Sequence, residues 1–258
     1  MSEKAESDTQ RPQVQGAAAV TKGLRLLQVI PELGQDAHAR HIQQRLGMPR
    51  PTVYRLLNTL EKEGFIERNP LGGEYVLGRQ LIHLAQQSLT RSNLRERVRG
   101  LMYLISKDTG ETVHLGVPYG CHMTFIDKVE SAEAVRMASY IGMPVPMHST
   151  SVGKAYLAAL DEESREQYLV QLQLEAITER TLTDRGALRN ELLRTRQRGY
   201  AIDDEENEAG IICFGHAVHG VDGRVAGAIS VSVPCYRLKE DTASHIVQSI
   251  AAHLKALK

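Results

Sequence analysis

The first eighty residues alternate short amphipathic stretches with turn-forming residues. A first helix is predicted from apolar residues that recur three or four positions apart, namely Val20, Leu24, Leu27 and Ile30. We expect these residues to form the inner face of the helix. Proline interrupts helical hydrogen bonding, so the helix is expected to end at Pro31.

A second helix is predicted over residues 37–46. Asp36 precedes it and can cap its first turn, and Gly47 follows it, where a left-handed residue commonly ends a helix. Its inner face is expected to consist of Ala39, Ile42 and Leu46. Two short helices joined by a glycine-containing turn have the spacing of a helix-turn-helix.

A third helix and a hairpin complete this pattern. The segment MPRPTVYRLLNTLEKEG is amphipathic and ends at Gly64, and its inner residues are Val53, Leu56, Leu57 and Leu60. Residues 65–68 and 74–77 are strand-like runs on either side of the turn-rich segment NPLGG. Three helices followed by a hairpin predict a winged helix over residues 16–78.

The outer face of the third helix, which also exposes Thr59, carries side chains that suit DNA. Between residues 22 and 60 there are six Lys or Arg residues and two acidic ones, although Lys+Arg and Asp+Glu each total 31 in the whole chain. Cations near phosphates release counterions, and Arg, Asn or Thr can read base edges. The alternative is a solvated helical face without a partner. We expect operator DNA to contact Lys22, Arg25, Arg40, Arg50, Thr52, Tyr54, Arg55 and Asn58.

Composition narrows the class of protein further. A chain of 258 residues is long enough for one large domain or two ordinary ones. Its three cysteines have no paired spacing, which is typical of a reducing cytoplasm and free thiols. The longest apolar stretch, residues 225–233, is too short to span a bilayer. Residues 1–15 are polar and carry acids, which predicts a disordered arm rather than a targeting signal.

Residues 79–92 continue a helical pattern and are predicted to form a linker helix. Its apolar side consists of Leu81, Leu84, Ala85 and Leu89. That side can pack on its own domain or pair with a second subunit, and the second arrangement suits two-fold operators. We therefore expect a homodimer or a dimer of dimers.

From residue 93 to residue 258 the pattern alternates helices and strands, which predicts an α+β domain with a substantially antiparallel sheet. Helices are expected over residues 94–110, after the loop at 144–150, over 182–199 and over 241–257, and strands over 111–117 and 122–130. Thr183 is a plausible cap for the third of these helices, and Gly199 is its expected end.

Asp222 and Gly223 lie between two apolar runs and predict a two-residue hairpin turn. If Val221 faces Arg224, one face of the hairpin carries the pairs Cys213–Ser232, Gly215–Ser230 and Ala217–Ala228, all of them small. The other face carries Ile212, Phe214, Ile229, Val231 and Val233, which are typical of a core. The small face can be covered by a closely packed helix, or it can leave room for a ligand.

Two neighbouring features favour a ligand. The segment HSTSVGK places three hydroxyl residues at a helix start, where N–H groups attract an anion. The segment DDEENE precedes the hairpin, and its first residue, Asp203, can accept a hydrogen bond from a ligand hydroxyl.

Other functions are less well supported by the sequence. SVGKA lacks the first glycine and the Ser/Thr of a phosphate-binding P-loop. A nucleophilic Cys213 with His216 or His219 as base is a possible hydrolase, but alternation places Cys213 and His216 on opposite faces of the strand. The same residues with His148 match no standard zinc spacing. A sensor that acts through protein partners is a further alternative.

Three stretches resemble the IclR family of bacterial regulators. They are QQRLGMPRPTVYRLLNTLEKEGFIER with YVLGRQLIHLA after the wing, PVPMHSTSVGKAYLAAL, and GYAIDDEENEAGIICFGHAVHGVDGRVAGAISVSVP. The resemblance covers about residues 17–255. Relatives often have a small or polar residue in place of Pro51, which the first turn of a helix tolerates.

The resemblance implies a winged helix followed by a GAF/profilin-like effector domain that binds a small molecule. The pocket positions it implies are Ser151, Val152, Asp203, Cys213, Ser230 and Ser232. It implies a regulator, more often a repressor, of a catabolic operon, which needs no cofactor or metal and catalyses no reaction. The effector is expected to be a small keto, hydroxy or sugar acid, and TERTLTD is similar to the corresponding segment of members that sense sugar acids.

Overall fold

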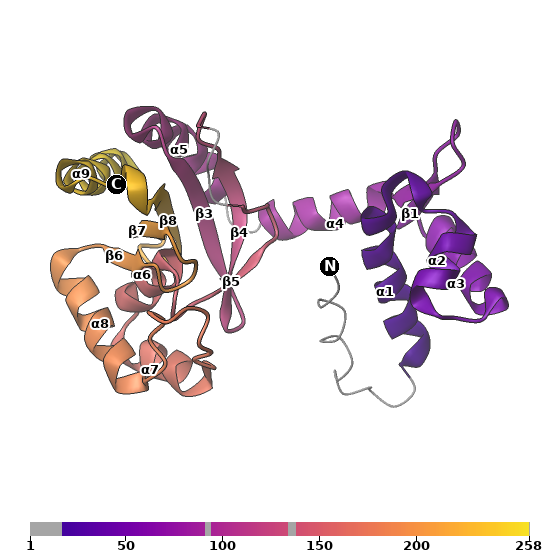
Figure 1. Cartoon of the computed structure of the whole chain (residues 1–258), viewed down its shortest axis with the longest axis horizontal. Helices are drawn as coiled ribbons and strands as arrows, with labels where there is room; N and C mark the ends of the chain where they lie inside the picture. The colour runs from indigo at the N-terminus through magenta and orange to yellow at the C-terminus, as the bar shows by residue number, and fades with distance from the viewer. Residues whose placement is uncertain (1–16, 91–93, 134–137, 258) are drawn as a thin grey trace. The chain divides into compact units, whose positions relative to one another are not determined.

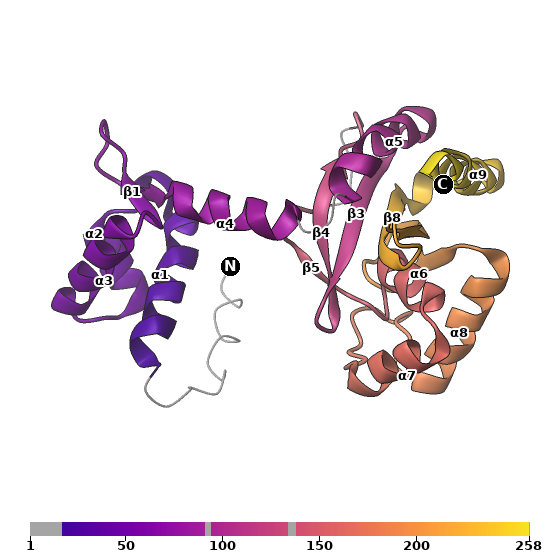
Figure 2. The ribbon, with the colours of Figure 1, turned by 180° about the vertical axis from the view of Figure 1, so that it is seen from behind.

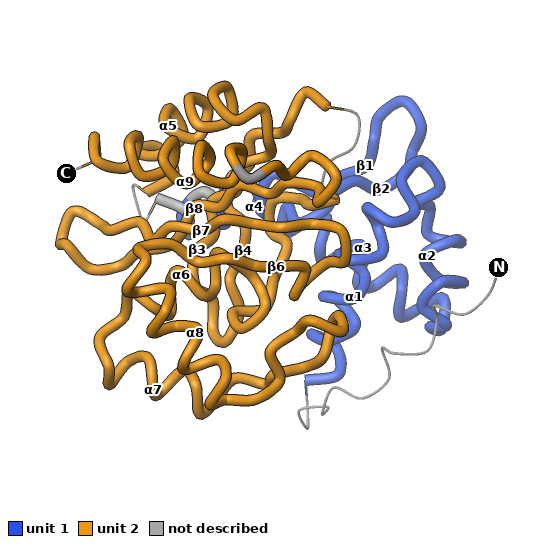
Figure 3. The backbone as a smooth tube through the Cα atoms, turned by 60° about the vertical axis from the view of Figure 1, so that its left-hand side comes forward, with its two compact units in different colours: residues 1–90 blue, residues 91–258 orange. Residues whose placement is uncertain are grey.

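The computed structural model describes residues 17–90, 94–133 and 138–257. The chain divides into two compact units, residues 1–90 and residues 91–258 (Figure 3). The predicted arm over residues 1–15 and the end of the predicted linker helix at 91–92 lie outside the described residues. Each unit has its own core and is described separately.

The N-terminal unit is a winged helix (Figure 1). Its helices are α1 (Ala18–Leu33), α2 (Ala39–Leu46), α3 (Arg50–Lys62) and α4 (Arg79–Thr90), with a 3-10 turn at Gly34–Asp36. The wing consists of β1 (Ile66–Arg68) and β2 (Tyr75–Leu77), which pair antiparallel with Glu67 opposite Val76. The predicted order of three helices and a hairpin is confirmed.

The buried face of α1 differs from the prediction. Val20 and Leu24 are 65% and 57% exposed, whereas Leu26 and Ile30 are buried. Apolar residues lie on two sides of this helix, so their spacing alone does not select the side that packs. Contacts with α2 and β2 make that selection.

Two helix ends also differ from the prediction. Pro31 does not end α1, because the proline removes only one N–H group and the helix continues to Leu33. Asp36 does not cap α2, because it belongs to the preceding 3-10 turn and the N-cap position is His38. Gly47 follows α2 in the left-handed conformation with φ of 62°, as predicted.

The C-terminal unit contains a six-stranded antiparallel sheet in the order β5-β4-β3-β8-β7-β6. The strands are β3 (Thr112–Tyr119), β4 (His122–Val129), β5 (Pro144–Pro146), β6 (Ala201–Asp204), β7 (Ile211–His219) and β8 (Val225–Pro234). The helices are α5 (Leu94–Thr109), α6 (Ser151–Ala159), α7 (Glu162–Gln171), α8 (Arg185–Arg198) and α9 (Glu240–Leu254), with 3-10 turns at Cys235–Arg237 and Lys255–Leu257. The predicted α+β class is confirmed.

The two faces of the sheet are covered differently (Figure 2). Helices α5 and α9 pack against each other and on one face. Helix α6 packs on the other face, and α7 and α8 pack on α6. Among the described residues, no helix is long and apolar enough to cross a membrane.

Two helices of this unit show the limits of the sequence pattern. The cap of α8 is Asp184, whose side chain accepts a 2.8 Å hydrogen bond from the N–H of Ala187, so the predicted cap at Thr183 is wrong. Helix α7 is not predicted, because it buries only Arg165 and Leu169 and has no continuous apolar stripe. Gly199 ends α8 with φ of 85°, as predicted.

The register of the β7–β8 hairpin is as predicted along most of its length. Cys213 lies opposite Ser232, Gly215 opposite Ser230, and Ala217 opposite Ala228. The tip differs, because the register shifts after Val218 and the turn runs from Gly220 to Arg224. The residues of the two predicted faces therefore lie on opposite sides of the sheet.

Candidate DNA-binding surface and effector site

The outer face of α3 is open to a partner. Val53 and Leu57 are buried, and the opposite side exposes Arg50, Tyr54, Arg55 and Asn58, while Thr52 is half-buried. The Arg50 guanidinium lies 5.3 Å from the centre of the Tyr54 ring, so these two side chains present a joint cationic and aromatic surface. Lys62, which was not among the predicted DNA contacts, is exposed on the same side, seven residues after Arg55.

The expected phosphate contacts lie on the other helices. Lys22 and Arg25 are exposed on α1, and Arg40 is exposed on α2. None of the three forms an ion pair with another residue that the structure describes, whereas Arg45 pairs with Glu32 at 3.5 Å. The local positive charge is therefore largely uncompensated, as phosphate binding requires.

The six expected effector residues lie close together and are buried. Asp203, Cys213 and Ser232 face one another in one row across β6, β7 and β8. The Cys213 thiol donates to Ser232 Oγ over 3.2 Å. The next row places Ser230 beside Gly215. Asp203, Cys213 and Ser232, together with Ser230 in the adjacent row, are called the polar row below.

Helix α6 begins over the polar row and covers part of the small face. A Cβ atom on Gly215 would lie 2.3 Å from the carbonyl oxygen of Ser151, so only glycine permits this approach. Val152 lies near Gly116 on β3. The small face was expected either to be covered by a closely packed helix or to leave room for a ligand. At Gly215 the structure shows the closely packed helix.

His114 on β3 completes this site and was missed in the sequence analysis. It lies opposite Ser230, and its Nδ1 is 3.4 Å from Ser232 Oγ. Its Nε2 is 2.8 Å from Ser139 Oγ, and its ring stacks on Phe125 at 4.5 Å. Burial lowers the pKa of His114 to about 3, so the imidazole is neutral at physiological pH.

Asp203 has a structural role in the acidic turn. Its Oδ1 accepts hydrogen bonds from the N–H groups of Glu206 at 2.9 Å and Asn207 at 3.2 Å. Burial raises the pKa of Asp203 to about 7, because the charged carboxylate loses its hydration. A protonated Asp203 can donate a hydrogen bond to a carboxylate, whereas an ionised Asp203 repels one.

A buried ion pair fixes the acidic turn to α6. The side chain of Lys154 is fully buried, and its Nζ donates to Glu206 Oε1. Glu206 Oε2 is buried and has no hydrogen-bond partner among the described residues. Burial raises the pKa of Glu206, and the charge of Lys154 opposes this shift. Lys154 lies in the segment SVGKA, which does not match a P-loop, and nothing else in the local sequence marks it as a buried residue.

The rival chemistries find little support in this geometry. Burial raises the pKa of the Cys213 thiol well above its usual range, and the nearby Asp203 adds to the shift. His216 lies on the opposite face of β7 from Cys213, so it cannot act as the base for this thiol. Within the described ranges, no group of three or more His, Cys, Asp or Glu residues is arranged to hold a metal ion.

Comparisons with known proteins agree with both units. Residues 19–70 match the IclR helix-turn-helix domain, and residues 86–257 match the bacterial transcriptional regulator IclR C-terminal domain. The chain is 33% identical over 222 residues to the HTH-type transcriptional regulator XynR of Escherichia coli, covering 86% of this chain and 88% of XynR. It is 32% identical over 230 residues to the acetate operon repressor of Salmonella typhimurium, covering 88% and 84% of the two chains.

A solved structure supports the same assignment. The crystal structure of Thermotoga maritima IclR superposes with a TM-score of 0.82 at 31% identity, covering 93% of this chain and 97% of that one. The helix-turn-helix domain and the C-terminal domain of this chain thus each match the IclR family over their own residues. The chain belongs to the IclR family of bacterial transcriptional regulators and is a DNA-binding regulator of transcription.

Proposed function

We propose that this regulator binds a two-fold operator as a homodimer or a dimer of dimers and represses a catabolic operon. Repression is supported by a relative at 32% identity that is named the acetate operon repressor. Helices α1 and α4 leave Val20, Leu24, Ile82 and Leu84 exposed, and a second subunit can cover such apolar side chains. Because bacterial DNA lies in the cytoplasm, the protein acts there. It acts by binding and not as an enzyme.

The effector is a small carboxylate, such as a keto, hydroxy or sugar acid, held by the polar row and the start of α6. The observation that carries this proposal is the buried polar row beside a helix N-terminus. The N–H of Gly153 donates to the Thr150 side chain, whereas the N–H groups of Ser151 and Val152 have no acceptor among the described residues. Such groups bind anions, and the short side chains of the row limit the volume of the ligand.

Effector binding is proposed to favour one arrangement of the linker helices α4 in the oligomer. A change in that arrangement alters the spacing of the two winged helices and so the affinity for an operator whose half-sites are fixed. The change in DNA affinity cannot exceed the difference between the effector's affinities for the two arrangements.

The test combines a metabolite titration with a DNA-binding assay. A panel of pyruvate, lactate and gluconate is titrated into the full chain by calorimetry, and promoter DNA is followed by mobility shift. Ser230→Ala is expected to weaken binding of the active acid about ten- to a hundredfold, because it removes one hydrogen bond to a charged group. Ser230→Leu is expected to abolish the response and to leave effector-free DNA binding intact. A normal response in Ser230→Leu would place the effector elsewhere, and absence of a mobility shift would favour a protein partner.

A further inference from the structure

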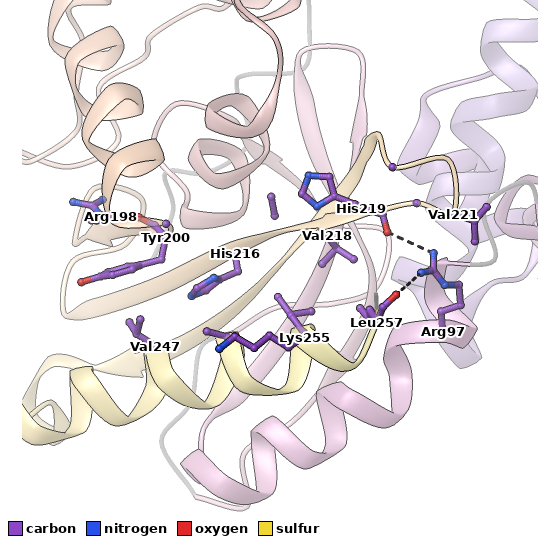
Figure 4. A pocket seen from close by; sticks show the side chains of 16 residues that line it. Arg97, Arg198, Tyr200, His216, Val218, His219, Val221, Val247, Lys255 and Leu257 are labelled. Atoms are coloured by element: carbon purple, nitrogen blue, oxygen red, sulfur yellow. Dashed lines mark hydrogen bonds between the residues drawn. The ribbon is translucent and has the colours of Figure 1, made fainter.

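A cavity lies on the opposite face of the sheet from the polar row. It has a volume of about 890 Å³ and is lined by β7, the hairpin tip, the residues before β6 and the C-terminal part of α9 (Figure 4). Its apolar lining includes Val218, Val247, Ala251, Leu254 and Leu257. Cys213 points toward α6 whereas His216 and Val218 point toward α9, so the two sites do not share side chains.

The charges at this cavity are of one sign. Its lining includes Arg97, Arg198 and Lys255 and contains no acidic residue. Arg198 is paired with Glu191 at 2.6 Å. Arg97 donates to the carbonyl oxygens of His219 at 3.5 Å and Leu257 at 3.4 Å, which carry no net charge. Neither Arg97 nor Lys255 forms an ion pair within the part of the chain that the structure describes, so both cations remain available to an anion.

One wall of the cavity is flat and aromatic. The rings of Tyr200 and His216 stack with centroids 5.9 Å apart and an interplanar angle of 25°. Figure 4 shows both rings and the Lys255 side chain extending into the same space, with Arg97 at the other end. The Nε2 atom of His216 is buried and has no hydrogen-bond partner among the residues that the structure describes. Burial lowers the pKa of His216 to about 4, so the ring is neutral and can take part in one more hydrogen bond.

We propose that this cavity is a second ligand site, which takes an aromatic carboxylate of one or two rings. The volume lies in the range of small-molecule pockets, and the combination of apolar walls with a few polar groups is typical of them. The aromatic body lies against the apolar wall and the Tyr200–His216 stack, and the carboxylate pairs with Lys255 or Arg97. Arg97 already joins the hairpin tip to the C-terminal 3-10 turn, so a ligand at this site acts on both segments.

The test uses 1-naphthoate as the probe and the full-length chain. Calorimetry of the wild-type chain is expected to show one equivalent bound per chain at this cavity, with a rise in Tm. Ala251→Phe places a bulky ring in the cavity and Lys255→Glu reverses a charge, and each is expected to weaken binding at least tenfold. The matched controls Ala252→Phe and Lys107→Glu, at exposed positions outside the lining, are expected to bind within twofold of wild type. Ser230→Leu is expected to retain binding, because it alters the other face.

Three results would overturn the proposal. The first is the absence of 1-naphthoate binding to the wild-type chain. The second is wild-type affinity in both Ala251→Phe and Lys255→Glu, with circular dichroism showing that they fold. The third is loss of binding in Ser230→Leu but not in Ala251→Phe, which would place the probe in the polar row. A change of oligomeric state in Ala251→Phe, without binding of 1-naphthoate to the wild-type chain, would make the cavity a subunit interface instead.

Discussion

Replacement of the buried Lys154 by methionine tests how the acidic turn is held. The Lys154 side chain is 0% exposed and that of its partner Glu206 is 10% exposed, so solvent cannot replace the lost charge. Methionine keeps most of the apolar stem but leaves the Glu206 carboxylate buried without a counter-charge. Breaking one side of a buried pair typically costs about 3–5 kcal/mol, and we expect Lys154→Met to lower the free energy of unfolding by this amount.

The double variant Lys154→Met/Glu206→Gln separates this cause from lost packing. Removing both charges leaves no stranded ion, so the double variant is expected to recover most of the loss. The pH dependence gives a second check on Lys154→Met. Without the lysine the pKa of Glu206 rises further above its unfolded value, so the folded state binds more protons. The stability of Lys154→Met is therefore retained at low pH and lost as pH rises through the pKa of Glu206 in the folded state.

Urea unfolding followed by circular dichroism between pH 5 and 8 measures these differences, since the unfolding free energy is linear in urea. A loss below about 1 kcal/mol in Lys154→Met at pH 8 would contradict the stranded-charge argument, because exposed pairs contribute about that much. Equal stability of the single and double variants would also contradict it. Effector titration of the double variant then tests whether the Lys154–Glu206 pair positions Asp203, since weaker effector binding in a folded variant would indicate that it does.

Three other predictions follow from the site and the core. Arg55→Ala is expected to weaken operator binding by about 1–3 kcal/mol, whereas Arg25→Ala is expected to reduce the salt slope by about one, as measured by fluorescence anisotropy; wild-type behaviour of both would contradict the docking of α3. Because the pKa of Asp203 is raised to about 7, its contribution to stability falls as pH rises from about 4 to 7, by up to about 1.4 kcal/mol per unit. Asp203→Asn should remove that part of the pH dependence of stability. A carboxylate effector should bind the wild-type chain more tightly as pH falls through 7. If neither pH profile behaved in this way, Asp203 would be ionised in the folded protein. Ile229→Ala should lower the unfolding free energy by about 2–5 kcal/mol, and an unchanged Tm would mean that the two hairpin faces are reversed.

Local signals were sufficient for most of the fold. Gly47 and Gly199 have positive φ at the ends of their helices, and glycine is the residue that takes this conformation without strain. The pattern was insufficient where it offered two solutions or none. Leu24 and Leu26 are both apolar, and only packing on α2 and β2 determines which one is buried. Helix α7 has too few apolar residues to produce a periodic signal.

The site was predictable where it depends on one hairpin and not where it depends on distant pairing. Cys213 and Ser232 follow from the register, because alternation and a short turn fix their relative positions. His114 joins them only because β3 lies beside β8, more than a hundred residues later, and no local pattern specifies that neighbour. Lys154 was missed because a lysine is almost never fully buried, and its partner Glu206 is 52 residues away.

Strand β7 serves both proposed ligand sites, because its alternate side chains point to opposite faces of one sheet. Cys213 belongs to the polar row, and His216 faces the cavity lined by Tyr200 and α9. A ligand on either face therefore acts on the same backbone, and the two sites are expected to be coupled. Coupling of binding free energies is reciprocal. If the active acid changes the Kd of 1-naphthoate by some factor, 1-naphthoate must change the Kd of the acid by the same factor. Two calorimetric titrations, each with the other ligand saturating, measure both factors. Unequal factors would show that one of the ligands also binds at a third place. Factors equal to one would contradict coupling through β7.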